Sequence, residues 1–181
     1  SIPLIFLLVL SFFNSYFLII TLIILSLISW IEFQGLINKI FKVKIYILLI
    51  NLLGLFYLII FSSLVYFGIL QENFKINILY LFLVCILSDI GGLLFGKIFK
   101  GKKLTKISPN KTISGSIGSF VLSLVLVPFF YFFFNEKFLN LFHLILISFL
   151  VSFFCQVGDL FVSFLKRRAK VKDTGSILPG H

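Results

Sequence analysis

Charged side chains are scarce in this sequence, and acidic ones are scarcest. Only 12% of the 181 residues are charged, with six acids against sixteen bases. A soluble domain needs more polar surface than this composition supplies. Since 60% of the residues are hydrophobic, we expect lipid to be the solvent for most of the chain. The composition therefore excludes an ordinary soluble globular domain.

Cysteine is also rare, and its spacing forms no motif. Cys85 and Cys155 lie in separate apolar segments and lack the paired spacing of a zinc or redox site. Isolated cysteines of this kind usually behave as small buried hydrophobic residues. We therefore expect no disulfide, and the cysteines do not indicate a redox compartment.

Long apolar segments fill most of the sequence. Most of them reach the roughly 20 residues that a helix needs to cross the hydrocarbon core of a bilayer. The sequence therefore predicts an all-α fold, a polytopic transmembrane helical bundle with about six spans. The apolar segments lie at approximately 2–13, 15–34, 45–70, 76–98, 113–134 and 138–165.

Two features of this segmentation concern the organisation of the chain. The segment 45–70 is long enough either to tilt as one span or to break near Gly54 into two. We expect residues 1–75 to form N-terminal membrane helices, and residues 76–181 to form the membrane region that carries the chemistry.

Basic residues gather in alternate connections between the apolar segments. Three lysines follow the second segment, six lie from Lys97 to Lys111, and five bases lie from Lys166 to Lys172. The other connections are nearly uncharged. The positive-inside rule then places both ends of the chain in the cytoplasm, together with loops 97–112 and 166–181.

Two acids, Asp89 and Asp159, interrupt otherwise apolar segments. Burying a carboxylate in a bilayer costs several kcal/mol unless it is paired, solvated or bound to a metal, so an acid inside a span indicates a functional site. A structural ion pair with a lysine is the alternative. On a helix, the second acid would belong to one polar stripe that also presents hydroxyl and ammonium groups. The stripe comprises Gln156, Asp159, Ser163 and Lys166.

The loop before the fifth apolar segment has the features of an anion site. The tripeptide 108–110, Ser-Pro-Asn, favours a turn, and Thr112 or Ser114 can cap the helix that follows. Free backbone N–H groups at such a helix start suit a phosphate. Two glycines that would allow close approach and two lysines that would supply charge complete the expected site: Gly115, Gly118, Lys106 and Lys111.

Gly92 and Gly96 form a pair of small residues on one face of the fourth predicted span. Such a pair lets another helix approach closely. It equally leaves room for a ligand, and both interpretations stay open.

Taken in order, these segments resemble the phosphatidate cytidylyltransferase family, also called the CDP-diacylglycerol synthase family. The C-terminal signature of that family runs Ser-x-x-Lys-Arg, four residues, Lys-Asp, a small residue, and then Pro-x-His. Upstream, DIGG and FGK within 89–97, SPNKT at 108–112 and QVGD at 156–159 also match, so the resemblance covers roughly residues 89–181. The signature positions are filled by Ser163, Lys166, Arg167, Lys172, Asp173, Gly175, Pro179 and His181.

The resemblance implies nucleotidyl transfer, in which a phosphate oxygen of phosphatidic acid attacks the α-phosphorus of CTP and pyrophosphate leaves. It implies Mg²⁺ as the cofactor, with Asp159 and Asp89 as metal ligands. The catalytic residues that it implies are Asp159, Lys166, Arg167 and Asp173. The substrate-binding residues that it implies are Ser108, Lys111, Thr112, Ser163, Lys172 and His181.

The resemblance also bears on partners and location. It implies CTP, phosphatidic acid and the lipid bilayer as partners, implies no nucleic acid, and leaves a homodimer open. We expect an integral protein of a bacterial inner membrane with its active site on the cytoplasmic side.

The sequence departs from the family pattern at several points. Leu93 stands where an aromatic residue is common, and Ser114 stands where Glu or Gln is usual. In the family the chain continues beyond the position of His181 into Asp-Arg-x-Asp, whose first acid is thought to share the metal with the equivalent of Asp159. Since residue 1 is not Met and no such segment follows, we expect a C-terminally truncated fragment.

Two rival functions stay open. A transporter or channel for an anionic solute would use Asp89 and Asp159 as coupling acids. It predicts two related halves with broken helices, which the sequence does not show. A non-catalytic membrane subunit would keep the fold and lack the metal site.

Overall fold

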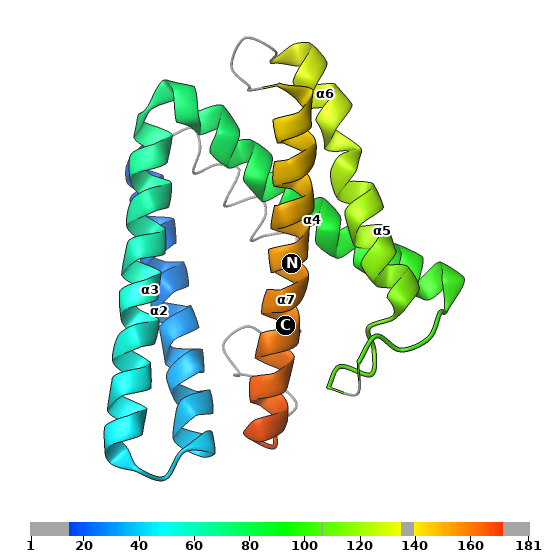
Figure 1. Ribbon diagram of the computed structural model, residues 1–181. Coiled ribbons are helices and arrows are strands. Elements are labelled where there is room, and N and C mark those ends of the chain that lie inside the picture. Colours follow the sequence, from blue (N-terminus) through cyan, green and yellow to red (C-terminus); the bar gives the residue numbers. More distant parts are fainter. Residues whose placement is uncertain (1–14, 106, 135–139, 172–181) are drawn as a thin grey trace. The chain divides into compact units, whose positions relative to one another are not determined.

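The computed structural model describes residues 15–105, 107–134 and 140–171, and most of these residues are helical (Figure 1). Within them, an isolated bridge between Lys103 and Thr112 is the one β-type pairing. The predicted all-α fold is therefore confirmed. The helices are α2 (Ser15–Ile40), α3 (Lys44–Leu70), α4 (Glu72–Phe99), α5 (Ile113–Leu124), α6 (Leu126–Phe133) and α7 (Leu141–Arg168).

Five helical stretches in the described part of the chain are long and apolar enough to cross a membrane. The sequence predicted about six spans, so the described residues hold one fewer than expected. The predicted segment 2–13 lies outside the described residues. The five stretches are Ile19–Ile40, Lys44–Leu70, Phe74–Phe99, Ile113–Phe133 and Leu141–Arg168.

Helix α3 runs without interruption past Gly54, so the predicted alternative of a break there is wrong. A Cβ atom on Gly54 would lie 2.7 Å from a ring carbon of Phe33 in α2. The glycine therefore serves close packing between neighbouring helices rather than a bend. At 27 residues, α3 is about 40 Å long, longer than a hydrocarbon core of about 30 Å.

The predicted span 113–134 divides into α5 and α6 at Val125. Pro128 has no N–H to donate to the carbonyl of Leu124, so the regular helical ladder is interrupted there. The N–H of Val125 instead bonds the carbonyl of Leu122 at 3.3 Å, a tighter turn. The two helices still form one continuous apolar stretch.

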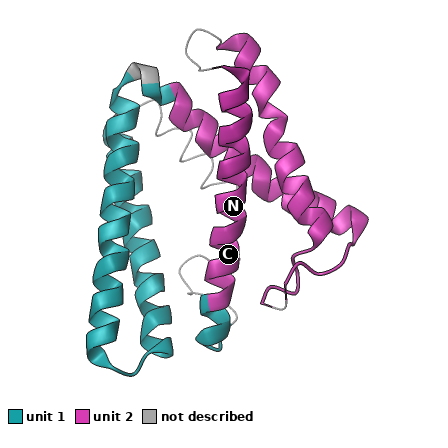
Figure 2. Ribbon diagram, in the orientation of Figure 1, with its two compact units in different colours: residues 1–75, 165–181 teal, residues 76–164 magenta. Residues whose placement is uncertain are grey.

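The chain separates into two compact units (Figure 2). Unit 1 comprises residues 1–75 and 165–181, and unit 2 comprises residues 76–164. In unit 1, α2 and α3 are joined by the short connection 41–43 and lie side by side (Figure 1). The hydroxyl oxygens of Ser26 and Ser62 lie 2.8 Å apart between these two helices.

Unit 2 contains a buried core drawn from three helices. The rings of Tyr80 in α4 and Phe130 in α6 meet edge to face, with centroids 4.8 Å apart. Val84, Val127 and Leu144 complete the cluster of buried residues. Close van der Waals packing of these side chains helps to hold α4, α6 and α7 together.

A row of polar side chains joins α4 to α7 within this core. The hydroxyl of Tyr80 bonds that of Ser148, and the hydroxyl oxygens of Ser88 and Ser152 lie 2.8 Å apart. These pairings satisfy polar groups where the bilayer offers no water. The two cysteines join the same row. Both are free thiols, and the Sγ atoms of Cys85 and Cys155 lie 3.2 Å apart.

Glycines bring α4 and α5 into close contact. A Cβ atom on Gly92 would lie 2.9 Å from the Ser119 hydroxyl oxygen, and one on Gly115 would lie 2.7 Å from the Gly92 carbonyl oxygen. Gly118 is likewise buried, against Phe95. Of the two interpretations of the glycines in α4, helix packing is therefore the correct one. The prediction that Gly115 and Gly118 admit a phosphate is wrong, because α4 occupies that space.

Candidate functional site

The loop 100–112 is folded back onto itself and onto the start of α5. The N–H of Lys111 bonds the Ser108 carbonyl at 3.1 Å, which confirms the turn predicted at 108–110. The N–H of Leu104 bonds the Lys111 carbonyl at 2.7 Å, and the N–H of Ile113 bonds the Lys102 carbonyl at 2.9 Å. These bonds fix the backbone on both sides of the turn.

The sequence predicted that either Thr112 or Ser114 caps the helix after the loop, and in the structure Thr112 caps α5. Its side-chain oxygen accepts a hydrogen bond from the N–H of Gly115 at 3.1 Å. The other candidate, Ser114, accepts a bond from the N–H of Gly101 at 3.3 Å and so attaches the loop to the helix. The cap therefore holds Lys111, the residue before it, at a defined position beside the helix start.

Lys111 reaches the acid predicted on α7. Its ammonium nitrogen lies 2.8 Å from the Oδ2 atom of Asp159. The Asp159 side chain is 56% exposed and that of Lys111 is 29% exposed. Two segments that are far apart in the sequence thus meet at one ion pair. Because the carboxylate is open rather than enclosed, other groups have access to it.

A second contact lies three residues earlier on α7. The hydroxyl of Ser116 in α5 donates to the Gln156 side-chain oxygen, and the Gln156 amide nitrogen donates to the Ser116 carbonyl at 3.4 Å. Gln156 and Asp159 therefore face α5 and its loop together, as the predicted stripe requires. Ser116 was missed by the sequence analysis, and its position one turn after the Thr112 cap is the signal that would have identified it.

The other predicted members of the stripe continue along α7. The Ser163 hydroxyl donates to the Asp159 carbonyl at 2.8 Å, within its own helix. Lys166 and Arg167 stand in the last turn of α7, about two helical turns beyond Asp159. Three further predicted site residues, Lys172, Asp173 and His181, lie outside the described residues, as does Lys106.

Asp89 belongs to the same neighbourhood. It lies in the C-terminal half of α4, is exposed, and interacts electrostatically with both Asp159 and Lys111. No group of three or more His, Cys, Asp or Glu side chains suited to a metal occurs in the described part of the chain. Two accessible carboxylates still fit Mg²⁺, which commonly takes one or two carboxylates and completes its shell with water and substrate phosphates.

The fold and this cluster define a polytopic helical membrane protein with an exposed acid–lysine site next to a capped helix start. The chain belongs to the cytidylyltransferase family, whose model matches residues 1–181.

Curated relatives match part of this chain. The phosphatidate cytidylyltransferase of Staphylococcus haemolyticus (strain JCSC1435) is 49% identical over 105 residues, which are 58% of this chain and 40% of that protein. The phosphatidate cytidylyltransferases of Staphylococcus aureus (strain COL) and Staphylococcus epidermidis (strain ATCC 12228 / FDA PCI 1200) are 47% and 44% identical, with the same coverage. The chain thus matches about 40% of the length of these relatives. No solved structure matches it significantly.

Proposed function

We propose that the protein transfers a cytidylyl group from CTP to phosphatidic acid. A phosphate oxygen of phosphatidic acid attacks the α-phosphorus of CTP and forms a new P–O bond. The bond between that phosphorus and the bridging oxygen breaks, pyrophosphate leaves, and CDP-diacylglycerol remains. Family membership and the names of the staphylococcal relatives support this reaction. The observation that carries it is the contact between Lys111 and Asp159, which joins two of the matching motifs.

The proposed reaction explains why the site needs cationic side chains. Both substrates are anions, so catalysis of phosphoryl transfer rests mainly on positioning and on neutralising charge. Lys111 is held at the start of α5, where the positive end of the helix dipole also favours an anion. The hydroxyls of Ser108 and Thr112 stand on the same turn and would donate to phosphate oxygens.

The last turn of α7 would supply further positive charge. Lys166 contributes a compact ammonium group. Arg167 offers a planar fork that binds two phosphate oxygens at once, which a lysine cannot do. The hydroxyl of Ser163 adds a hydrogen-bonding group on the way from Asp159 to this turn.

Asp159 and Asp89 would hold Mg²⁺, because their hard carboxylate oxygens suit that ion. When bound, the ion would neutralise phosphate charge and align the attacking and leaving oxygens. In the described chain, Lys111 compensates the charge of Asp159. An incoming phosphate would compete for that ammonium group and so expose the carboxylate.

The remaining assignments are predictions from the resemblance and from the positions of the basic loops. Lys172, Asp173 and His181 would bind or position the phosphates. The cytoplasmic location of the site, the bacterial inner membrane and a homodimer also stay predictions. Cysteine labelling of loop 97–112 from either side of sealed vesicles tests the orientation.

The test of this function is an assay on the full-length protein in mixed micelles with CTP, phosphatidic acid and Mg²⁺. Asp159→Asn should lower the rate of CDP-diacylglycerol formation by about a thousandfold, because the lost carboxylate would hold the Mg²⁺ that neutralises the phosphates. Membrane insertion and the unfolding temperature should stay close to wild type. Asp159→Glu, which keeps the carboxylate, should retain more activity than Asp159→Asn.

Two results would contradict the proposal. Wild-type activity in Asp159→Asn would remove the acid from the chemistry. A wild-type protein that inserts and folds but makes no product under any of these conditions would favour a non-catalytic subunit.

A further inference from the structure

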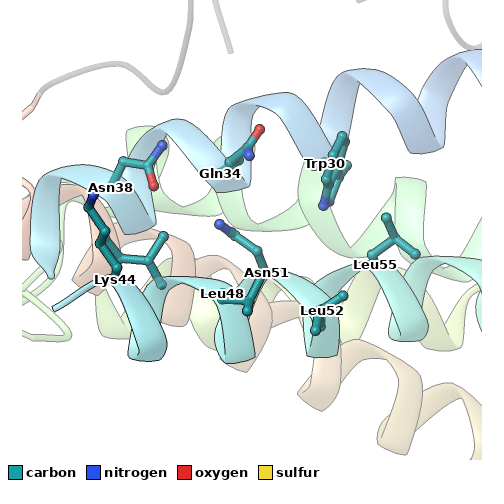
Figure 3. A pocket seen from close by; sticks show the side chains of 9 residues that line it. Trp30, Gln34, Asn38, Lys44, Leu48, Asn51, Leu52 and Leu55 are labelled. Carbon is teal, nitrogen blue, oxygen red and sulfur yellow. The ribbon is translucent and has the colours of Figure 1, made fainter.

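Unit 1 contains a cavity of about 420 Å³ between α2 and α3 (Figure 3). Its polar lining comes from both helices: Trp30, Gln34 and Asn38 from α2, and Lys44 and Asn51 from α3. Leucines of α3 line the rest of it, together with Ile47. Such a concentration of amide, indole and ammonium groups is unusual on a pair of helices that are otherwise apolar.

Two polar atoms of this cavity lack the hydrogen bonds that buried atoms normally make. Asn51 is only 8% exposed, and its side-chain oxygen has no hydrogen-bond partner. The indole nitrogen of Trp30 is also buried without a partner. Figure 3 shows both side chains directed into the space between the helices. Because buried polar groups are nearly always satisfied in native proteins, these two atoms point to a bound molecule that both accepts and donates hydrogen bonds.

The charge of the cavity indicates an anion. Lys44 lines it and has no carboxylate partner among the residues that the structure describes. Lys44 is also the first residue of α3, whose preceding residue, Val43, makes no side-chain cap. Uncapped N–H groups and a lysine at a helix start together favour a negatively charged ligand.

A second cavity continues the first one along the helices. It has a volume of about 360 Å³ and shares Trp30 and Leu55 with the first. The rest of its lining is apolar except for Ser26 and Ser62, whose hydroxyls bond each other. A polar, cationic end followed by an apolar groove matches an amphiphile with one acyl chain in the groove and does not match a free phosphate ion.

We propose that the α2–α3 groove is a binding site for one anionic phospholipid whose headgroup carries a hydroxyl. The phosphate accepts a hydrogen bond from Lys44, and a glycerol ester oxygen of the lipid accepts one from the indole N–H of Trp30. The headgroup hydroxyl donates to the Asn51 oxygen, and one acyl chain lies along the shared apolar groove. The site belongs to unit 1 and does not depend on the proposed cytidylyltransferase activity.

Trp30 is the one tryptophan in this sequence, so its fluorescence reports directly on the groove. The chain is placed in phosphatidylcholine nanodiscs that contain a small fraction of a lipid with brominated acyl chains, and quenching of Trp30 is measured. Brominated phosphatidylglycerol should quench at about tenfold lower content than brominated phosphatidylcholine, because only the former carries a net charge and a hydroxyl. Equal quenching by the two lipids would overturn the proposal.

Two variants test the residues that carry the argument. Lys44→Gln and Asn51→Leu should each remove most of the tenfold preference for phosphatidylglycerol. Lys39→Gln, which removes an equal charge from an exposed residue outside the cavity, should keep it. Asn51→Leu is a modest change in volume, and removing an unpaired amide should not weaken folding. The opposite result would be that Asn51→Leu keeps the preference for phosphatidylglycerol and raises the unfolding temperature. That result would mean that Asn51 is an unsatisfied buried residue that binds no lipid, and it would refute the site.

A third arm separates lipid from free phosphate. Inorganic phosphate, added at millimolar concentration, should leave quenching by brominated phosphatidylglycerol unchanged. Displacement of the lipid by inorganic phosphate would mean that the groove recognises the anion alone, contrary to the proposal.

Discussion

The two units of this chain solve the problem of packing in lipid in different ways. In unit 1, α2 and α3 meet through apolar side chains and one serine pair, and they leave two polar atoms in their cavity unsatisfied. In unit 2, α4 meets α7 through a row of paired hydroxyls and thiols, and it meets α5 through glycines. Between the helices of unit 2, most of the described polar atoms bond each other, with the buried side-chain oxygen of Asn77 and the exposed ion pair as exceptions. The polar atoms of Lys111 and Asp159, and those of the α2–α3 groove, are available to ligands.

The largest expected effect concerns the ion pair of unit 2. In the full-length protein, Lys111→Gln should lower CDP-diacylglycerol formation on the order of a hundredfold, because a fixed cation at the phosphates is lost. Lys39→Gln removes the same charge from the exposed end of α2 in unit 1 and should leave the rate within about twofold. The measurement is the initial rate with CTP and phosphatidic acid. Equal losses in both variants would mean that only the overall positive charge matters.

A smaller effect should follow from filling the α4–α5 contact. A Cβ atom on Gly91 would meet the Gly118 carbonyl, so Gly91→Ala should destabilise the chain by about 1–3 kcal/mol. A Cβ atom on Gly35 in unit 1 would have nothing within 4 Å, and Gly35→Ala should instead stabilise α2 by about 0.5–1 kcal/mol. Thermal unfolding in detergent, followed by circular dichroism, gives the sign of each change. A neutral Gly91→Ala would mean that α4 and α5 are not in close contact.

The smallest effect separates the hydroxyl pairs of the two units. A double-mutant cycle on Ser88→Ala and Ser152→Ala should give a coupling of about 0.6 kcal/mol, the usual size for hydrogen bonds between membrane helices. The half-buried pair Ser26 and Ser62 should give less, since it is more accessible. Coupling energies from reversible unfolding in mixed micelles decide between them. A larger value for the pair in unit 1 would mean that hydroxyl pairing matters more between α2 and α3 than between α4 and α7.

Much of the fold could be predicted from the sequence because span length is a local property. Apolar segments long enough for the bilayer correspond to all five described spans. The outcome at Gly54 could not be predicted, since whether a glycine bends a helix or admits a neighbour depends on what lies opposite, here Phe33. The division at Val125 was not predicted, although its cause, Pro128, is local and visible in the sequence.

The candidate site shows the same limit. The turn at 108–110, the cap at Thr112 and the shared face of Gln156 and Asp159 follow from short-range spacing and were predicted correctly as local features. Gly115 and Gly118 were assigned to a phosphate because glycine allows close approach. Their spacing does not show whether a ligand or another helix approaches them, and in the structure it is α4. The hydroxyl row between α4 and α7 was missed because each serine is unremarkable until its partner on the other helix is known.

The attachment of α5 to α7 sets how accurately one charge is placed. Ser116 is tied to Gln156, and Lys111 is tied to Asp159, on either side of the Thr112 cap. If α5 slid along its axis by even one residue, about 1.5 Å, both ties would stretch together. The position of the Lys111 ammonium group is therefore fixed by α5 and α7, although Lys111 itself belongs to a loop.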